Sequence, residues 1–487
     1  MRIPILLASA AALALAACDS GPFSGQSETG EAGSPVTDAQ TEQLREALKG
    51  AIRHGLTPDL FFKGDLDEAS GSDLRGAVLA YASALAMGKV DPTKISEVYT
   101  VPRPKIDVKA GFEKALAENR LAEWLDTLPP QTEEYRKLSQ AFVHYAELSA
   151  KTPDTNLPPG KAMKQGMRDP RVPALVEALK AGGYSQQPQD QEEDRQASPT
   201  PQPRADLYTA EVAAAVKRMQ QDFGLKADGI VGNETLRAVN TSARDRARQL
   251  AVALERLRWL ERDPPATRID VNTAATQLAY WRAGRLVEQR RVVVGQPGWE
   301  TPQLGSPIFQ LVANPTWTVP DSIVEEEIAK KSPAWLAENN FARKNGRWVQ
   351  QPGPKNSLGL VKFDMKNGEA IYLHDTPAKA LFALPQRHES HGCVRVQGAV
   401  DFARLLAEND GVLDKFDEAL ASGEEEFVDL QAEIPVRLLY HTAFVGSDGR
   451  IGFVDDVYGW DNDVAAALGY ERRQPKPVKR RAGDVGP

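Results

Sequence analysis

The spacing of apolar residues divides the chain into a helical part and a β-rich part. Between residues 41 and 150 the period is helical: Leu74, Val78, Tyr81 and Leu85 lie three or four positions apart and would share one helix face. After residue 267 the period changes to two, which predicts strands. The strand pattern covers residues 268–272, 277–281, 286–294, 308–312, 360–363, 370–373 and 436–442.

Residues 159–242 have the pattern of a smaller unit with an interruption. Residues 185–205 are rich in Gln, Pro, Asp and Glu and have no apolar period, which predicts a disordered insertion. The helix after it has Thr209 as candidate N-cap and a stripe of Val212, Val216 and Met219. A further amphipathic helix is predicted over 243–260, ending before two prolines.

These patterns predict an α+β multi-domain protein, which suits a length of 487 residues. We expect a helical scaffold domain, a small helical domain, a linking helix, a mixed β-rich domain with a cap insertion, and a C-terminal extension with a basic tail. The expected bounds are 41–158, 159–242, 243–266, 267–446 with the cap at about 321–369, and 447–487.

The N-terminus has the pattern of a secretory signal. Residues 1–17 combine Arg2 with a short apolar run, too short for a dependable membrane span. The following tetrad, Leu15-Ala16-Ala17-Cys18, resembles the bacterial lipobox, which implies acylation of Cys18 and a membrane-anchored periplasmic lipoprotein. The alternative is an ordinary signal peptide with an incidental Cys18. Residues 18–40 have almost nothing to bury and predict a flexible tether.

Charge and cysteine content narrow the function. The formal net charge of -8 argues against a general nucleic-acid binder, which needs a basic face. Cys18 and Cys393 are the only cysteines, so a disulfide framework is excluded. A lone thiol is a liability in an oxidising compartment, so Cys393 needs an explanation of its own.

Three interpretations of Cys393 compete. An inert core cysteine is disfavoured because its neighbours Ser390, His391, Gly392 and Arg395 are poor core material. A metal site would use Cys393 with histidines 374, 388 and 391, but this is not a usual zinc spacing. A nucleophile needs a base to form the thiolate, and His374 follows an apolar strand segment that could hold one. We favour the nucleophile, with no metal and no cofactor.

The segment also resembles the catalytic motif of the L,D-transpeptidases (YkuD-type), in which a histidine precedes Ser/Thr-His-Gly-Cys by 14 to 17 residues. His374 precedes Ser390 with 15 residues between them. Many members end the motif in Asn, where this chain has Arg395, as in the large, multi-domain branch of the family. Further matching segments are Val292-Val293-Val294-Gly295, Thr301-Pro302, Asn314-Pro315, Trp317, Val319-Pro320 and Tyr440-His441-Thr442-Ala443.

Two other segments carry resemblances. The stretch FGLKADGIVGNETLRAVN is similar to the small peptidoglycan-binding domain, whose signature appears as Asp228, Gly229, Gly232, Thr235 and Leu236. We expect these residues mainly to build the fold. The stretch YASALAMGKVDP resembles the scaffold domain of the large branch. Together the resemblances cover most of the chain after the tether.

The family resemblance implies a two-step acyl transfer. Cys393 would attack the amide before D-Ala in a tetrapeptide stem, with His374 as proton acceptor and donor, and a second stem's amine would then form a 3→3 cross-link. His391, Gly392 and Cys393 would offer main-chain N–H groups to the oxyanion. Substrate-binding roles would fall to Tyr372, Ser390 and Arg395, although a structural ion pair explains Arg395 equally well.

The implied partners are peptidoglycan stem peptides and glycan, and the membrane through the N-terminal lipid; no nucleic acid is expected. Hydrolysis of the acyl-enzyme and transfer of stems to a lipoprotein are alternative reactions. A non-catalytic wall anchor is a different class, and the intact pair of His374 and Cys393 argues against it.

The lipobox predicts the location of the protein. Cys18→Ala should move the protein from the membrane fraction to the soluble periplasm, because several buried acyl chains provide stable anchoring. Fractionation followed by immunoblotting measures this. Unchanged membrane association would contradict lipidation and point to the basic tail.

Overall fold

The computed structural model describes residues 36–151, 156–184, 205–222, 225–473 and 486. The signal segment 1–17, Cys18, most of the tether, residues 185–204 of the expected insertion and most of the basic tail lie outside the described residues. Within the described part of the chain, no helix is both long and apolar enough to cross a membrane.

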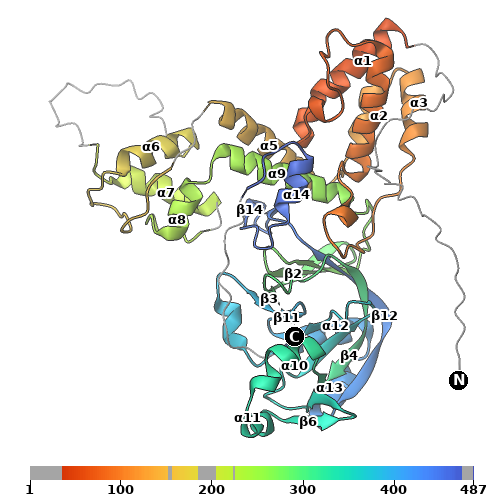
Figure 1. Ribbon diagram of the computed structural model, residues 1–487, viewed down its shortest axis with the longest axis vertical. Helices are drawn as coiled ribbons and strands as arrows, with labels where there is room; N and C mark the ends of the chain where they lie inside the picture. The colour runs from red at the N-terminus through yellow and green to blue at the C-terminus, as the bar shows by residue number, and fades with distance from the viewer. Residues whose placement is uncertain (1–35, 152–155, 185–204, 223–224, 474–485, 487) are drawn as a thin grey trace, which may run out of the picture.

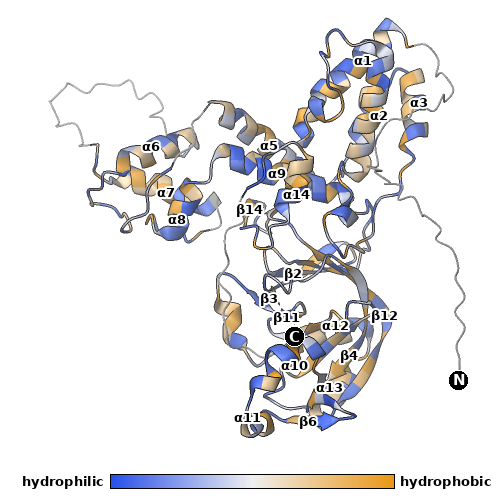
Figure 2. Cartoon of the chain, in the orientation of Figure 1, coloured by the Kyte–Doolittle hydropathy of each residue, from blue (hydrophilic) through white to orange (hydrophobic). Residues whose placement is uncertain are grey.

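The scaffold domain is a helical bundle whose first helix begins with a reciprocal capping box between Thr37 and Gln40. The face predicted on the second helix is buried, with Leu74, Val78 and Leu85 fully inaccessible, and Figure 2 shows this helix as largely apolar. The helices are α1 (Asp38–Lys49), α2 (Gly71–Met87), α3 (Val108–Ala117), α4 (Leu121–Thr127) and α5 (Glu133–Lys151), with 3-10 turns η1 (Gly50–His54), η2 (Pro58–Leu60) and η3 (Pro92–Lys94).

Helix α9 (Ala243–Trp259) is a central element of this bundle, not the linking helix expected from the sequence. It crosses the middle of the molecule beside α5 (Figure 1). Arg258 is fully buried and donates to Glu255 and to the hydroxyl of Tyr135, which also contacts His54. Burial lowers the pKa of His54 to about 3, in keeping with a structural histidine.

The small helical domain consists of α6 (Val172–Ala181), α7 (Ala210–Asp222) and α8 (Asn233–Val239), at the left of Figure 1. Its centre is Gln220, which is 1% exposed. The Gln220 amide donates to Asp228 and Thr235 and accepts from Gly229 N–H. These signature residues therefore hold the turn between α7 and α8, as expected.

The β-rich domain is built on one nine-stranded mixed sheet with the strand order β10-β3-β11-β9-β8-β4-β12-β1-β2. Because β2 also pairs with β3, this sheet closes on itself. Phe402 of α12 packs against Tyr280 and Phe363 in its core. The elements are β1 (Arg268–Asn272), β2 (Gln277–Arg282), β3 (Arg285–Gly295), β4 (Gly305–Ala313), β8 (Val361–Met365), β9 (Leu373–His374), β10 (His388–Ser390), β11 (Val394–Val396), β12 (Glu426–Leu439), α12 (Ala399–Asp410), α13 (Leu413–Ser422) and η5 (Lys379–Ala383).

The cap is a subdomain with its own apolar core, in which Trp335 stacks on Phe341. It contains the sheet β5-β7-β6 and two short helices. The expected bounds of 321–369 are wrong at the C-terminal side, because residues 361–365 form β8, whose alternating side chains enter the main core. The elements are β5 (Trp317–Thr318), α10 (Asp321–Glu326), η4 (Ile328–Lys330), α11 (Pro333–Glu338), β6 (Phe341–Lys344) and β7 (Arg347–Gln350).

The chain after β12 returns to the scaffold domain. Strands β13 (Ala443–Val445) and β14 (Ile451–Phe453) form a hairpin, and α14 (Asp461–Ala467) buries Val464 and Ala465 in the scaffold core. The expected boundary at residue 446 is therefore too late, since the main sheet ends with β12. Figure 1 shows this segment beside α9, between the scaffold and the main sheet.

Candidate active site

The parallel pairing of β9 with β11 assembles the candidate site. His374 lies opposite Arg395, and Leu373 lies opposite Val394. Paired residues of parallel strands point to the same face of a sheet, so His374 and Arg395 share one face while Leu373 and Val394 enter the apolar core.

Two more candidates immediately precede these strands. Val394 N–H donates to Tyr372 O at 3.1 Å, which places Tyr372 beside Cys393. The Tyr372 ring also contacts the His374 ring, with centroids 5.7 Å apart. The structure thus brings Tyr372, His374, Cys393 and Arg395 together, as the sequence predicts.

The thiol of Cys393 is buried and protonated in the resting protein. Its side chain contacts Ala370 O at 3.8 Å. Burial raises the pKa of the Cys393 thiol to about 11, and contacts with Tyr372 only partly oppose this effect. Formation of a thiolate would therefore require transfer of this proton to a base.

His374 is placed as a base for that step. Its Nδ1 donates to the main-chain carbonyl of Asp375, so Nδ1 carries the proton and Nε2 keeps its lone pair. Nε2 is buried and has no hydrogen-bond partner among the described residues. Burial, followed by the positive charge of Arg395, lowers the pKa of His374 well below its usual value, so the ring is neutral.

The loop before Cys393 is closed by Ser390. The Ser390 hydroxyl donates to Cys393 O at 2.6 Å and accepts from Gly392 N–H at 3.2 Å. Gly392 has a φ of +114°, which a residue with a Cβ rarely adopts. The Ser390 side chain, for which a substrate-binding role is expected, is inaccessible to solvent, and its hydroxyl bonds within the loop. The Gly392 N–H, which is expected to face an oxyanion, donates to the same hydroxyl.

The side chain of His391 joins the loop to the cap. Its Nε2 lies 3.2 Å from Glu327 Oε1, directly after α10. The indole of Trp299 packs edge-on against the ring, with centroids 5.0 Å apart. Its Nδ1 lies 2.6 Å from the main-chain carbonyl of Gly486. Sequence reasoning missed Glu327 and Trp299, because neither belongs to a recognisable motif.

The main chain at Gly486 lies in the site. A Cβ added to this glycine would lie 3.0 Å from a guanidinium nitrogen of Arg395 and 3.3 Å from Ser357 Cβ. The space beside His391 and Arg395 therefore accommodates a peptide backbone.

The histidines do not form a metal centre in the described part of the chain. No group of three His, Cys, Asp or Glu side chains is arranged there to hold a metal ion. The ring of His388 instead packs edge-on against Tyr458, with centroids 5.4 Å apart. Burial lowers the pKa of His388 to about 4.

Comparison with protein families gives three matches in separate parts of the chain. Residues 266–413 match the L,D-transpeptidase catalytic domain (YkuD), residues 33–142 match a scaffold domain, and residues 168–239 match a putative peptidoglycan-binding domain. The catalytic match contains His374 and Cys393, but not the segment after residue 413.

One curated relative is similar to part of this chain. A putative L,D-transpeptidase of Haemophilus influenzae is 31% identical over 223 residues, covering 41% of this chain and 45% of that protein. The chain thus matches less than half of the length of that relative.

Two solved structures are weakly similar. An L,D-transpeptidase from Mycobacterium smegmatis is 12% identical, covers 36% of this chain and 58% of its own, and has a TM-score of 0.19. L,D-transpeptidase 3 from Mycobacterium tuberculosis with a faropenem-derived adduct is 13% identical, covers 37% and 62%, and has a TM-score of 0.21. Similarity at these scores supports no conclusion.

The neutral state of the Cys393 and His374 side chains predicts how the rate of Cys393 alkylation depends on pH. In a Cys18→Ala background, the rate of alkylation of Cys393 by iodoacetamide should keep rising with pH toward about 11, because only the thiolate reacts. Peptide mass spectrometry at several pH values, over the range in which the protein stays folded, measures the rate. A plateau near neutral pH would instead reveal a preformed thiolate–imidazolium pair.

Proposed function

Because the chain carries an L,D-transpeptidase catalytic domain, we propose that the protein forms 3→3 cross-links in peptidoglycan through an acyl-enzyme on Cys393. The observation that supports this most directly is a pair of buried, neutral groups that both lie beside Tyr372. Its two members are the thiol of Cys393 and the imidazole of His374, whose Nε2 retains its lone pair. A neutral base and a protonated nucleophile are the starting state that general-base catalysis requires.

In the proposed acylation, Cys393 Sγ attacks the carbonyl carbon of the amide before D-Ala while His374 Nε2 takes the thiol proton. The same nitrogen then gives this proton to the amine of the departing D-Ala, leaving a thioester. The main-chain N–H groups of Cys393 and His391 are the proposed oxyanion donors, because Gly392 N–H is bonded to Ser390. Each such donor contributes about 10²–10³ in rate in other enzymes.

In the proposed second half-reaction, the side-chain amine of another stem attacks the thioester carbon. His374 Nε2 takes a proton from this amine and returns it to the departing sulfur. The new amide is the 3→3 cross-link, and both residues regain their starting protonation states. Water in place of the amine would give the carboxypeptidase reaction.

The surroundings of His391 and Arg395 support a peptide substrate. The site accommodates the main chain at Gly486, whose carbonyl contacts His391 Nδ1. Arg395 is 1% exposed and lies beside this backbone. We propose that these two side chains bind the main chain and the carboxylate of the stem peptide. The half-buried ring of Tyr372 would then form a wall of the substrate site.

The remaining parts of the chain support action at the cell wall. Residues 168–239 match a putative peptidoglycan-binding domain, and we propose that this domain holds the glycan near the catalytic domain. We further propose that lipidated Cys18 fixes the protein to a membrane, facing the periplasm.

Variants of the two central residues test the reaction. Expressed in a host without such enzymes, the wild-type protein should produce 3→3-linked muropeptides, and Cys393→Ser should produce none, because a hydroxyl is far less acidic than a thiol. His374→Ala should lower the rate by about 10²-fold or more through loss of the base. Mass spectrometry of digested peptidoglycan measures the products.

A carbapenem provides the matched chemical test, because its strained acyl group reacts with a positioned thiolate. Intact mass followed by peptide mapping should locate the adduct on Cys393 and find none in Cys393→Ser. An adduct elsewhere, or cross-links made by the serine variant, would exclude this mechanism. If the stems are shortened but no cross-links form, the protein catalyses the carboxypeptidase reaction and not transpeptidation.

A further inference from the structure

The carbonyl of Gly392, next to the nucleophile, is held from a distant part of the chain. The Thr301 hydroxyl donates to Gly392 O at 2.7 Å and accepts from Gly295 N–H at 2.9 Å. Thr301 is inaccessible to solvent. The loop before it is tightly folded, since a Cβ on Gly295 would lie 1.9 Å from Trp299 O.

Tyr458, in the segment after the hairpin β13–β14, fixes this loop in turn. Its hydroxyl donates to Gly295 O at 2.7 Å and accepts from Thr301 N–H at 3.3 Å. The Tyr458 ring stacks on Tyr440 at a centroid distance of 5.1 Å and packs at a tilt against Trp460 at 4.8 Å. The hydroxyl is therefore presented by a rigid aromatic cluster and not by a mobile loop.

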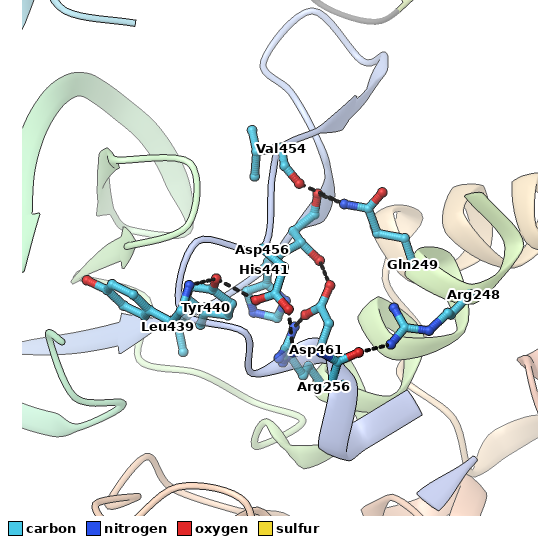
Figure 3. A network of polar contacts seen from close by, with 12 residues as sticks. Arg248, Gln249, Arg256, Leu439, Tyr440, His441, Val454, Asp456 and Asp461 are labelled. Atoms are coloured by element: carbon cyan, nitrogen blue, oxygen red, sulfur yellow. Dashed lines mark hydrogen bonds and ion pairs between the residues drawn. The ribbon is translucent and has the colours of Figure 1, made fainter. Parts of the chain in front are cut away.

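The cluster is anchored to the scaffold helix α9 through buried charges (Figure 3). Tyr440 donates to Asp456 at 2.8 Å, and Asp456 accepts from Asp461 N–H at 3.0 Å. The Asp461 carboxylate pairs with Arg256 of α9, and both side chains are almost fully buried. Gln249 of the same helix donates to the carbonyls of residues 442 and 454.

Because the peptide bond is planar, the hydrogen bond to Gly392 O also determines the direction of the Cys393 N–H. Gly392 C=O and Cys393 N–H belong to one trans peptide unit, so they point in opposite directions. A bond that fixes Gly392 O therefore also fixes the direction of Cys393 N–H. At Gly392, whose φ is +114°, the backbone itself allows many other orientations.

We propose that Tyr458 is a positioning residue of the catalytic domain, which acts through Thr301 to aim the Cys393 N–H at the oxyanion. It lies outside the matched residues 266–413, so the segment after the main sheet completes the site. The inference rests on the proposed nucleophilic role of Cys393.

Conservative variants of Tyr458 and Thr301 separate an effect on positioning from an effect on folding. Tyr458→Phe keeps the ring and removes the hydroxyl, and Thr301→Val keeps the side-chain shape and removes its hydroxyl. Each should lower the maximal rate of carbapenem acylation about tenfold, the loss expected for one or two buried hydrogen bonds. The carbapenem concentration that gives the half-maximal rate should stay within about twofold of the wild-type value. Thr301→Ser, which keeps the hydroxyl, should retain the wild-type rate within about twofold.

The matched control is Tyr208→Phe, which removes a buried tyrosine hydroxyl that donates to Gly229 O at 2.9 Å in the small helical domain. This variant should acylate at the wild-type rate. Because Tyr458 and Thr301 act in one chain of contacts, the double variant should lose much less than the product of the two single losses.

Thermal unfolding of each variant identifies the folded fraction to which rates are normalised. A wild-type acylation rate for folded Tyr458→Phe, equal losses in Thr301→Ser and Thr301→Val, or losses confined to the half-maximal concentration would overturn the inference. Failure of the wild-type protein to acylate on Cys393 would instead reject the proposed function itself.

Discussion

The site depends on one constraint, the parallel register of β9 and β11. This pairing places His374 opposite Arg395 and seats Leu373 and Val394 in the core on the other face. A slip of one residue would exchange the two faces, placing the charged guanidinium of Arg395 in the apolar core and removing an apolar side chain from it. The same apolar packing that stabilises the sheet therefore fixes which side chains meet at the catalytic face.

Burial has opposite effects on the two reacting groups, and together these effects define the resting state. It raises the pKa of Cys393 and lowers the pKa of His374, because each charged form loses hydration. Arg395 adds positive charge beside the ring and further disfavours the imidazolium. The thiol is therefore protonated in the resting protein, and the proposed reaction begins with transfer of its proton to His374.

Local patterns predicted those features that depend on neighbouring residues in the chain. The helical face of α2, the period-two strands and the pair of His374 and Cys393 could all be read from spacing. The role of α9 could not be predicted from spacing, because an amphipathic stripe does not show which elements pack against it. The bonds of the Ser390 hydroxyl within the loop could not be predicted either, because they depend on backbone geometry. Tyr458 carried no local signal, since its partners lie about 160 residues away in sequence.

The acyl-enzyme itself provides the most direct test of the central claim. The protein is mixed with a tetrapeptide stem whose side-chain amine is acetylated, so that the stem can donate but cannot accept. Rapid quenching and intact-protein mass spectrometry should detect the stem minus D-Ala as a thioester, mapped to Cys393, with release of one D-Ala for each adduct. Release of D-Ala without any covalent adduct, or an adduct on another residue, would contradict the account.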